Sequence, residues 1–459
     1  MRYIICIICV ALFISSAGVA GLESIQIERQ EPQPEMQPLG TDRYDLVIIA
    51  PEAFTEVLQT LVDHKRDNGV ATLLETVESI IATYEGRDDA EKLKYYLKDA
   101  VEDFGVSYAL LVGGRKPLGS EWYVPVRYAH ANDRSEYDAF LSDLYFADIY
   151  NGEGHFEDWD SNGNDVFGEF SLMQKDVMDL RPDIAVGRLP CRTVREVDIV
   201  VEKIIDYETN AYGQSWSNRM VAIGGNSFPQ TDLEPFPYEG EATCNVATSY
   251  MDDYEVTKLY TSDSSFVGTS DLVNTINNGC GFMLTRGKGG TDRVRMVTQD
   301  GEELIALQNL FVPLLRNRGQ YPIVVLGECI HGKFDVSMMN FLDGDTPYNC
   351  VPECIAWRLI RCNGGGAIAT LTNTNLCYGS PGDNDGNGIP DDAELYGGRL
   401  AVDIFRLIGD GMQTLGDIHA EAVRSYVDDL PVMDNVIHCK SVQEFILLGD
   451  PSLRIGGYP

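Results

Sequence analysis

A cysteine that follows a short apolar run is the residue of this sequence best placed to do chemistry. Five apolar or β-branched residues after Tyr321 run into Gly327, and Cys329, His331 and Gly332 come next. Such a run indicates a fully buried strand of an α/β sheet, and these sheets place their chemistry just past the carboxyl ends of the strands. A thiol there can be a nucleophile if a base or a positive field lowers its pKa. The alternative is a buried structural cysteine.

A second strand end carries a glycine-rich turn. The run Gly281-Phe-Met-Leu-Thr-Arg286 ends in Gly287-Lys288-Gly289-Gly290. If the two strands are neighbours in a parallel sheet, the thiol and the glycine turn face one cleft. We therefore predict that these two strand ends form a single site.

A base for the thiol is the next requirement. His331 lies two residues from Cys329 and is the one histidine near it in sequence. The others are far along the chain, where a surface or core position is the ordinary expectation. Lys288, with an unperturbed pKa of ~10, is charged at neutral pH and cannot accept the thiol proton unless burial lowers that pKa.

Two acidic loops match the template of a calcium-binding loop, with oxygen ligands at alternate positions, a glycine at the sharp turn and a final glutamate. The predicted ligands of the first loop are Asp158, Asp160, Asn162, Asn164 and Glu169, and those of the second are Asp383, Asp385, Asn387, Ile389, Asp391 and Glu394. Calcium would hold together a loop that otherwise repels itself. The alternative for each loop is an acidic turn that binds no ion.

Strands that alternate with helices along the chain predict a parallel sheet with helices on both faces. A polar break near residues 213–218 predicts two sheet-bearing subdomains, 43–212 and 213–459. Within the second we expect helices at 239–251, 271–278 and 302–315, with strands around Phe282 and before Cys329.

Composition and the first residues limit the compartment and the partners. The chain has 459 residues and a net charge of −36, which argues against nucleic acid and anionic membranes as partners.

Residues 1–20 have a basic start, an apolar run and small residues, which predicts a signal peptide and a secreted protein. Residues 21–42 are predicted to be a flexible leader or short pro-segment. No later apolar run is long enough to cross a membrane. In an oxidising compartment some of the nine cysteines outside the signal should form disulfides.

Several motifs taken together resemble the gingipain-like cysteine peptidases, family C25 of the caspase-like clan. They are the strand followed by Gly-x-Gly, the strand followed by Gly-x-Cys, Leu110-Leu-Val-Gly-Gly, Pro182-Asp-Ile-Ala-Val-Gly-Arg-Leu-Pro and Leu447-Leu-Gly-Asp-Pro-Ser-Leu453. The resemblance extends over about residues 43–457. It implies a three-layer α/β/α caspase-like fold and hydrolysis of peptide bonds in protein substrates.

The resemblance also assigns roles to residues. Cys329 takes the nucleophile position, and the backbone N–H groups of Cys329 and Gly289 would form the oxyanion hole. The family's catalytic histidine falls on Lys288, and its supporting acid falls near Asn226. This departure leaves open a catalytically dead homologue that acts as a calcium-stabilised extracellular binding or scaffold protein.

Substrate selection is a further expectation from the resemblance. The family's pocket acid falls at a helix start, where Glu239 or Glu241 could favour Arg or Lys at the cleaved bond. The alternative is that these acids only stabilise the helix N-terminus. The oligomeric state is not predicted.

Overall fold

A computed structural model describes residues 43–117, 119–131, 139–228, 235–343 and 349–459. The predicted signal peptide and leader lie outside these residues. Among the described helices, none combines the length and apolar character needed to cross a bilayer.

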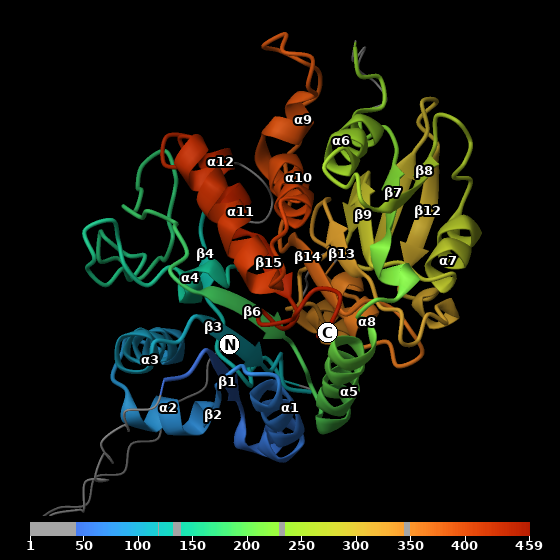
Figure 1. Cartoon of the computed structure of the whole chain (residues 1–459). Coiled ribbons are helices and arrows are strands. Elements are labelled where there is room, and N and C mark those ends of the chain that lie inside the picture. The colour runs from blue at the N-terminus through green and yellow to red at the C-terminus, as the bar shows by residue number, and fades with distance from the viewer. Residues whose placement is uncertain (1–42, 118, 132–138, 229–234, 344–348) are drawn as a thin grey trace, which may run out of the picture. The chain divides into compact units, whose positions relative to one another are not determined.

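A ten-stranded sheet forms the centre of the fold (Figure 1). Its strands, in spatial order, are β2 (Thr72–Thr76), β1 (Leu46–Ala50), β3 (Tyr108–Val112), β6 (Ala185–Leu189), β15 (Phe445–Leu448), β14 (Ala369–Asn373), β13 (Ile323–Leu326), β9 (Phe282–Arg286), β7 (Arg219–Gly224) and β8 (Glu255–Tyr260). Most neighbours are parallel, as predicted, but β15 runs antiparallel to β14. The central strands are buried along their whole length, because helices cover both faces.

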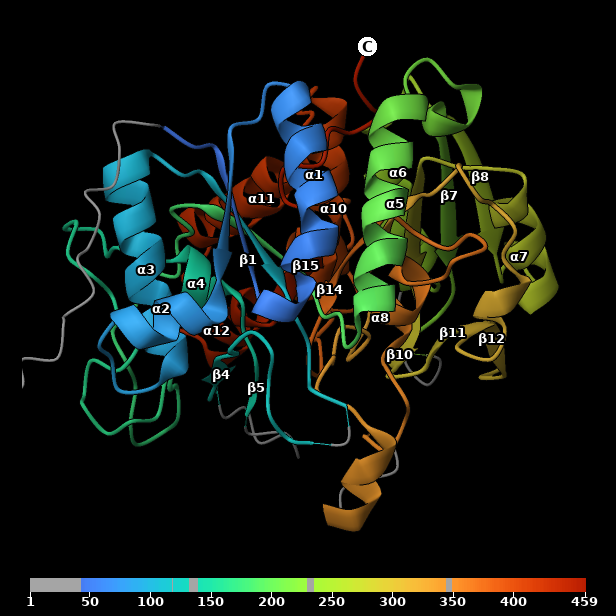
Figure 2. The same ribbon diagram turned by 90° about the horizontal axis from the view of Figure 1, so that it is seen from below.

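Helices lie on both sides of this sheet. They are α1 (Thr55–Asp67), α2 (Val77–Thr83), α3 (Asp89–Phe104), α4 (Leu144–Ala147), α5 (Val194–Asn210), α6 (Glu239–Thr248), α7 (Thr269–Asn277), α8 (Ile355–Ile360), α9 (Asp391–Glu394), α10 (Tyr396–Gly409), α11 (Leu415–Asp429) and α12 (Val436–Gln443). Figures 1 and 2 show α1 and α5 together on one face and α6, α10 and α11 on the other. The result is the three-layer α/β/α arrangement that the sequence predicts.

The two predicted subdomains contribute neighbouring parts of one sheet. Strands before residue 213 form one end, strands after it form the other, and β15 joins them through its parallel contact with β6, where Leu448 pairs with Arg188. Residues 43–459 accordingly belong to one compact unit. A single hydrophobic core extends across the polar break at 213–218.

The predicted helix at 302–315 is wrong. Residues Glu303–Gln308 form β12, which pairs with β11 (Arg293–Val297), and β11 pairs with β10 (Lys288–Gly290). Leu304, Ile305, Ala306 and Leu307 give the same apolar run in either structure, so their periodicity cannot decide between helix and strand. This small antiparallel sheet carries the glycine-rich turn.

The expected disulfides are not found at eight of the nine cysteines outside the predicted signal, since Cys329 and Cys377 are free thiols as well as the six that follow. Cys191, Cys244, Cys280, Cys354, Cys362 and Cys439 are buried thiols. They behave as small core residues.

Candidate active site

The structure brings the two strand ends together. Strands β9 and β13 are parallel neighbours, with Thr285 paired to Leu326, so the chain leaves both at the same edge of the sheet. Gly289 then packs against the backbone of Cys329. A Cβ on Gly289 would lie 2.7 Å from the Cys329 nitrogen and would clash with its carbonyl oxygen. Only glycine allows this approach.

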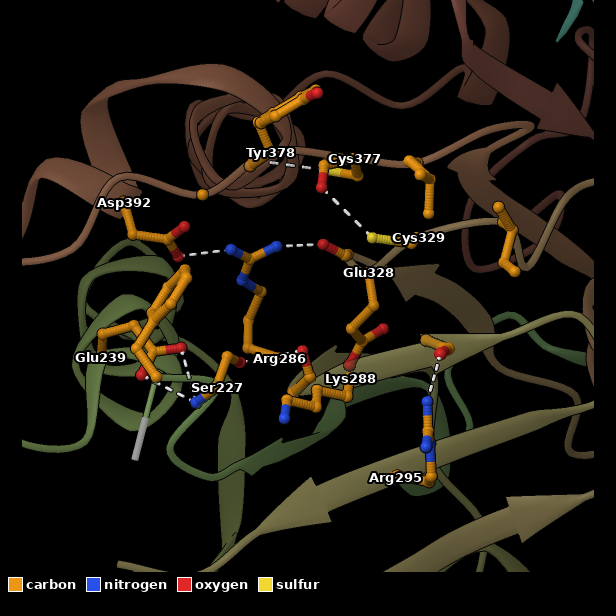
Figure 3. A pocket seen from close by; sticks show the side chains of 17 residues that line it. Ser227, Glu239, Arg286, Lys288, Arg295, Glu328, Cys329, Cys377, Tyr378 and Asp392 are labelled. Atoms are coloured by element: carbon orange, nitrogen blue, oxygen red, sulfur yellow. Dashed lines mark hydrogen bonds and ion pairs between the residues drawn. The ribbon is translucent and has the colours of Figure 1, made fainter. Parts of the chain in front are cut away.

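A cavity of about 520 Å³ opens at this edge (Figure 3). The ends of β9 and β13 and the segment after β14 line it, together with the start of α6 and Asp392 of α9. The lining includes Lys288, Gly289, Cys329, Cys377 and Asp392. The cavity therefore holds the thiol and the glycine turn on a common wall.

Cys329 carries a protonated thiol in this arrangement. Its Sγ–H donates to the carbonyl oxygen of Cys377, 3.2 Å away. Burial raises the pKa of the thiol to about 11, and the positive charge of Arg286 opposes that rise only in part. The Cys329 backbone N–H has no acceptor among the described residues. It is thus able to donate to a ligand oxygen.

Lys288 occupies the turn but is not held at the thiol. Its side chain is 38% exposed, and its Nζ lies 3.9 Å from a carboxylate oxygen of Glu303 on β12. Lys288 lines the cavity and contributes positive charge to its mouth.

His331 lies outside the cavity lining. It is fully buried, and its Nε2 lies 3.0 Å from the carbonyl oxygen of Arg293. Burial lowers the pKa of the imidazole to about 4. All six histidines belong to the described part of the chain, and none of them lines the cavity.

Of the two acids predicted for the substrate pocket, one lines the cavity and the other does not. Glu239 lines the cavity, and both its carboxylate oxygens accept from the backbone N–H of Ser227, at 3.0 and 2.9 Å. Glu241 turns away and accepts from the Ser262 hydroxyl, which lies 2.5 Å from it. Asn226 is buried, and its side-chain oxygen accepts from the Phe228 N–H.

The acidic loop at 383–394 has the geometry of a cation site. Carboxylate oxygens of Asp383, Asp385 and Asp391 lie within 4.8 Å of one another, close enough to share one ion. The Asn387 side chain donates to Glu394, which brings the last predicted ligand to the same loop. Oxygen ligands on a flexible loop suit Ca²⁺.

The loop at 158–169 is organised differently. The guanidinium of Arg87 pairs with Asp158 and Asp160 at 2.8 and 2.5 Å. Asn164 donates from its side chain to Glu169. A fixed positive charge therefore already meets two of the predicted ligands.

Sequence reasoning missed several cavity residues, among them Arg286, Cys377 and Asp392. Arg286 ends β9 and directly precedes the glycine turn, so a charged residue closing an otherwise apolar strand was a usable signal. Cys377 follows β14, the other neighbour of β13. Asp392 belongs to the acidic loop at 383–394, whose other acids were predicted to be calcium ligands.

The fold and the thiol at the strand end define the class of the caspase-like cysteine peptidases. A crystal structure of the Arg-specific cysteine proteinase gingipain R is similar to this chain, with a TM-score of 0.62 and 16% identity over 91% of this chain and 79% of that one. The complex of the pro- and mature domains of Porphyromonas gingivalis RgpB gives 0.61 and 17%, over 90% and 79%.

The profile of peptidase family C25 matches residues 41–456, and the chain belongs to that family. Gingipain R2 of P. gingivalis is 22% identical over 345 residues. That match covers 73% of this chain but only 38% of the gingipain.

Proposed function

We propose that this protein is a cysteine-type peptidase that attacks peptide bonds with Cys329. The supporting observation is the close packing of Gly289 on Cys329, which sets the glycine turn beside the thiol and leaves the Cys329 N–H without a partner among the described residues. An N–H group beside the thiol can stabilise the negative charge that develops on the substrate carbonyl oxygen during attack.

The chemistry begins as the Cys329 thiol gives its proton to solvent water, since no histidine of the described residues lines the cavity. The Cys329 sulfur then forms a bond to the carbonyl carbon of the substrate, and the backbone N–H groups of Cys329 and Gly289 donate to the carbonyl oxygen. The C–N bond breaks, the amine takes up the proton released in the first step through solvent, and water then hydrolyses the thioester to the acid and restores the Cys329 thiol. Lys288 supplies positive charge that favours the thiolate.

A second function has a specific observation in its favour. No histidine lines the cavity, and the thiol pKa of about 11 leaves little thiolate at neutral pH. A homologue that binds peptides without cleaving them would show these features. It would be an extracellular binding or scaffold protein on the same fold.

We also propose that the loop at 383–394 binds one structural Ca²⁺, supported by the convergence of its three aspartates. Residues 1–20 have the composition of a signal peptide, which supports secretion. Calcium in the loop at 158–169 stays a prediction.

Labelling with a peptidyl electrophile separates peptidase from binding protein. The native protein, Cys329→Ala and Lys288→His are treated with the same acyloxymethyl ketone, and the modified residue is mapped by mass spectrometry. A peptidase gives labelling on Cys329 that is lost in the alanine variant, and Lys288→His accelerates it by at least ~10-fold because a histidine can relay the proton. Labelling of Lys288→His alone would identify the non-cleaving protein.

A further inference from the structure

One end of the cavity is walled by three ionisable side chains that come from three elements. Glu239 begins α6, Arg286 ends β9 and Asp392 lies in α9, with 2%, 7% and 1% of each residue exposed. All three line the cavity that contains Cys329. Figure 3 shows Arg286 between Asp392 and the strand end that carries Cys329.

The positive charge of Arg286 is already neutralised by another residue of this wall. One of its terminal nitrogens donates to Asp392, and the other donates to the carbonyl oxygen of Gly327. The Thr243 hydroxyl donates to the same Asp392 oxygen, at 2.7 Å. Arg286 and Asp392 thus form a buried ion pair with no net charge.

Glu239 is the third ionisable residue of this wall. Burial, followed by the nearby charge of Asp392, raises the pKa of Glu239 to about 7. Its two oxygens are engaged by the Ser227 N–H. An arginine or lysine side chain that entered here would meet the positive guanidinium of Arg286, which opposes a second cation in the same wall.

The wall nevertheless retains unused hydrogen-bonding capacity. The Arg286 Nε–H and one carboxylate oxygen of Asp392 are buried and have no partner among the described residues. A buried polar atom without a partner is costly, so a ligand that satisfies it is favoured. Both residues line the cavity, so the pair places one unused donor and one unused acceptor in its wall. A carboxamide supplies the complementary acceptor and donor in one planar group.

We propose that this end of the cavity receives the substrate side chain that precedes the cleaved bond, and that it selects a carboxamide, Asn or Gln, over Arg or Lys. The inference rests on the proposed use of the cavity for peptides. It changes the specificity expected from Glu239 alone, because Arg286 occupies the wall that a basic side chain would need.

Binding to the Cys329→Ala protein tests the inference without any chemistry. Blocked five-residue peptides that differ only at the central residue (Asn, Gln, Asp, Leu, Arg or Lys) are titrated by calorimetry. Asn and Asp have the same shape and differ in charge, so they form the matched pair. We expect the Asn or the Gln peptide to bind at least ~10-fold more tightly than the Asp, Leu, Arg and Lys peptides. Tightest binding of Arg or Lys, equal binding of all six, or no binding at all overturns the inference.

Two variants test whether Arg286 and Asp392 cause the preference for a carboxamide. Arg286→Met with Asp392→Leu removes both charges together, which a fold tolerates better than the loss of one partner. It should bring the Asn and Leu peptides within about threefold of each other, and a retained preference would contradict the assignment. Glu241→Gln, outside the cavity lining, is the matched control and should keep the order. If the double variant does not fold, the peptide series on the unaltered wall still decides.

Cleavage of the same peptides by the native protein is measured in parallel. Carboxamide-selective binding without cleavage keeps this inference and removes the proposed hydrolysis. Cleavage after Arg or Lys keeps the hydrolysis and removes the inference.

Discussion

At the scale of single residues, the site combines a well-placed thiol with a weak means of activating it. Gly289 packs closely on Cys329, and the Cys329 thiol donates to Cys377 and has a raised pKa. Lys288 is paired with Glu303. If Cys329 attacks a substrate as proposed, that substrate must first displace the hydrogen bond to Cys377.

Gly289→Ala should abolish labelling of Cys329 by a peptidyl electrophile. The added Cβ clashes with the Cys329 carbonyl and nitrogen, so the turn must move and the oxyanion donors lose their positions. We expect a loss of at least ~100-fold and a destabilisation of about 2 kcal/mol. Gly290→Ala, whose Cβ would meet the Arg293 side chain at 3.2 Å and the Arg293 carbonyl oxygen at 3.5 Å, is the milder control. Equal labelling in both variants would argue against the oxyanion hole.

Glu328, the residue before Cys329, should make stability depend on pH. Burial raises the pKa of its carboxyl from 4.5 to about 7. Between these values the folded protein keeps a proton that the unfolded chain releases. The contribution of Glu328 is thus complete below pH ~4.5 and is lost as the pH rises through about 7.

Thermal melts of the native protein and Glu328→Gln from pH 4.5 to 8 measure this effect. The variant should gain about 1–3 kcal/mol relative to the native protein as the pH rises across that window. Glu302→Gln, an exposed acid nearby, should follow the native curve. A constant difference between native and Glu328→Gln would show that Glu328 does not titrate in this range.

At the scale of elements, the sequence predicted the strands that carry the chemistry and missed how the turn is supported. The apolar runs before Gly287 and Gly327 identified β9 and β13, because buried parallel strands have that composition. Their adjacency could only be hypothesised, since strand order depends on long-range pairing that no local run of residues encodes. Because residues 302–315 were predicted to be a helix, neither the β10–β12 sheet nor the pairing of Lys288 with Glu303 was predicted.

The same limit applies to the cavity wall. Glu239, with Glu241 as the other candidate, was predicted from the family resemblance, but the pairing of Arg286 with Asp392 joins residues 106 positions apart in the chain. No local pattern specifies such a contact. The loop at 158–169 likewise matched the calcium template, although Arg87, 71 residues before Asp158, supplies its positive charge.

The two acidic loops should differ in their response to calcium. Added Ca²⁺ should raise the melting temperature by several degrees relative to chelator, because an ion bound only by the folded state stabilises it. Asp385→Asn should remove most of this response, and Asp160→Asn should leave most of it, since Arg87 already neutralises Asp160. The reverse order would place the principal site at 158–169, and no response in the native protein would refute calcium in both loops.

At the scale of the whole molecule, the two predicted halves share one sheet and one core. The β6–β15 contact and the continuous core across residue 213 couple the stability of the two halves. The sequence indicated two α/β units because each half repeats the same alternation of strands and helices. It did not indicate that β15, at the end of the chain, closes the sheet between them.

Calorimetry should accordingly show one cooperative transition for residues 43–459. Limited proteolysis near 213–218 should not release a folded half. Two transitions, or a stable fragment that ends in this segment, would contradict the single core.

The most direct test of the account is a crystal structure of the native protein with a peptide aldehyde that ends in Asn. We predict a bond from the Cys329 sulfur to the aldehyde carbon, with the resulting oxygen within hydrogen-bonding distance of the Cys329 and Gly289 N–H groups. An aldehyde that remains unattached, or an adduct whose oxygen points away from both donors, would contradict it.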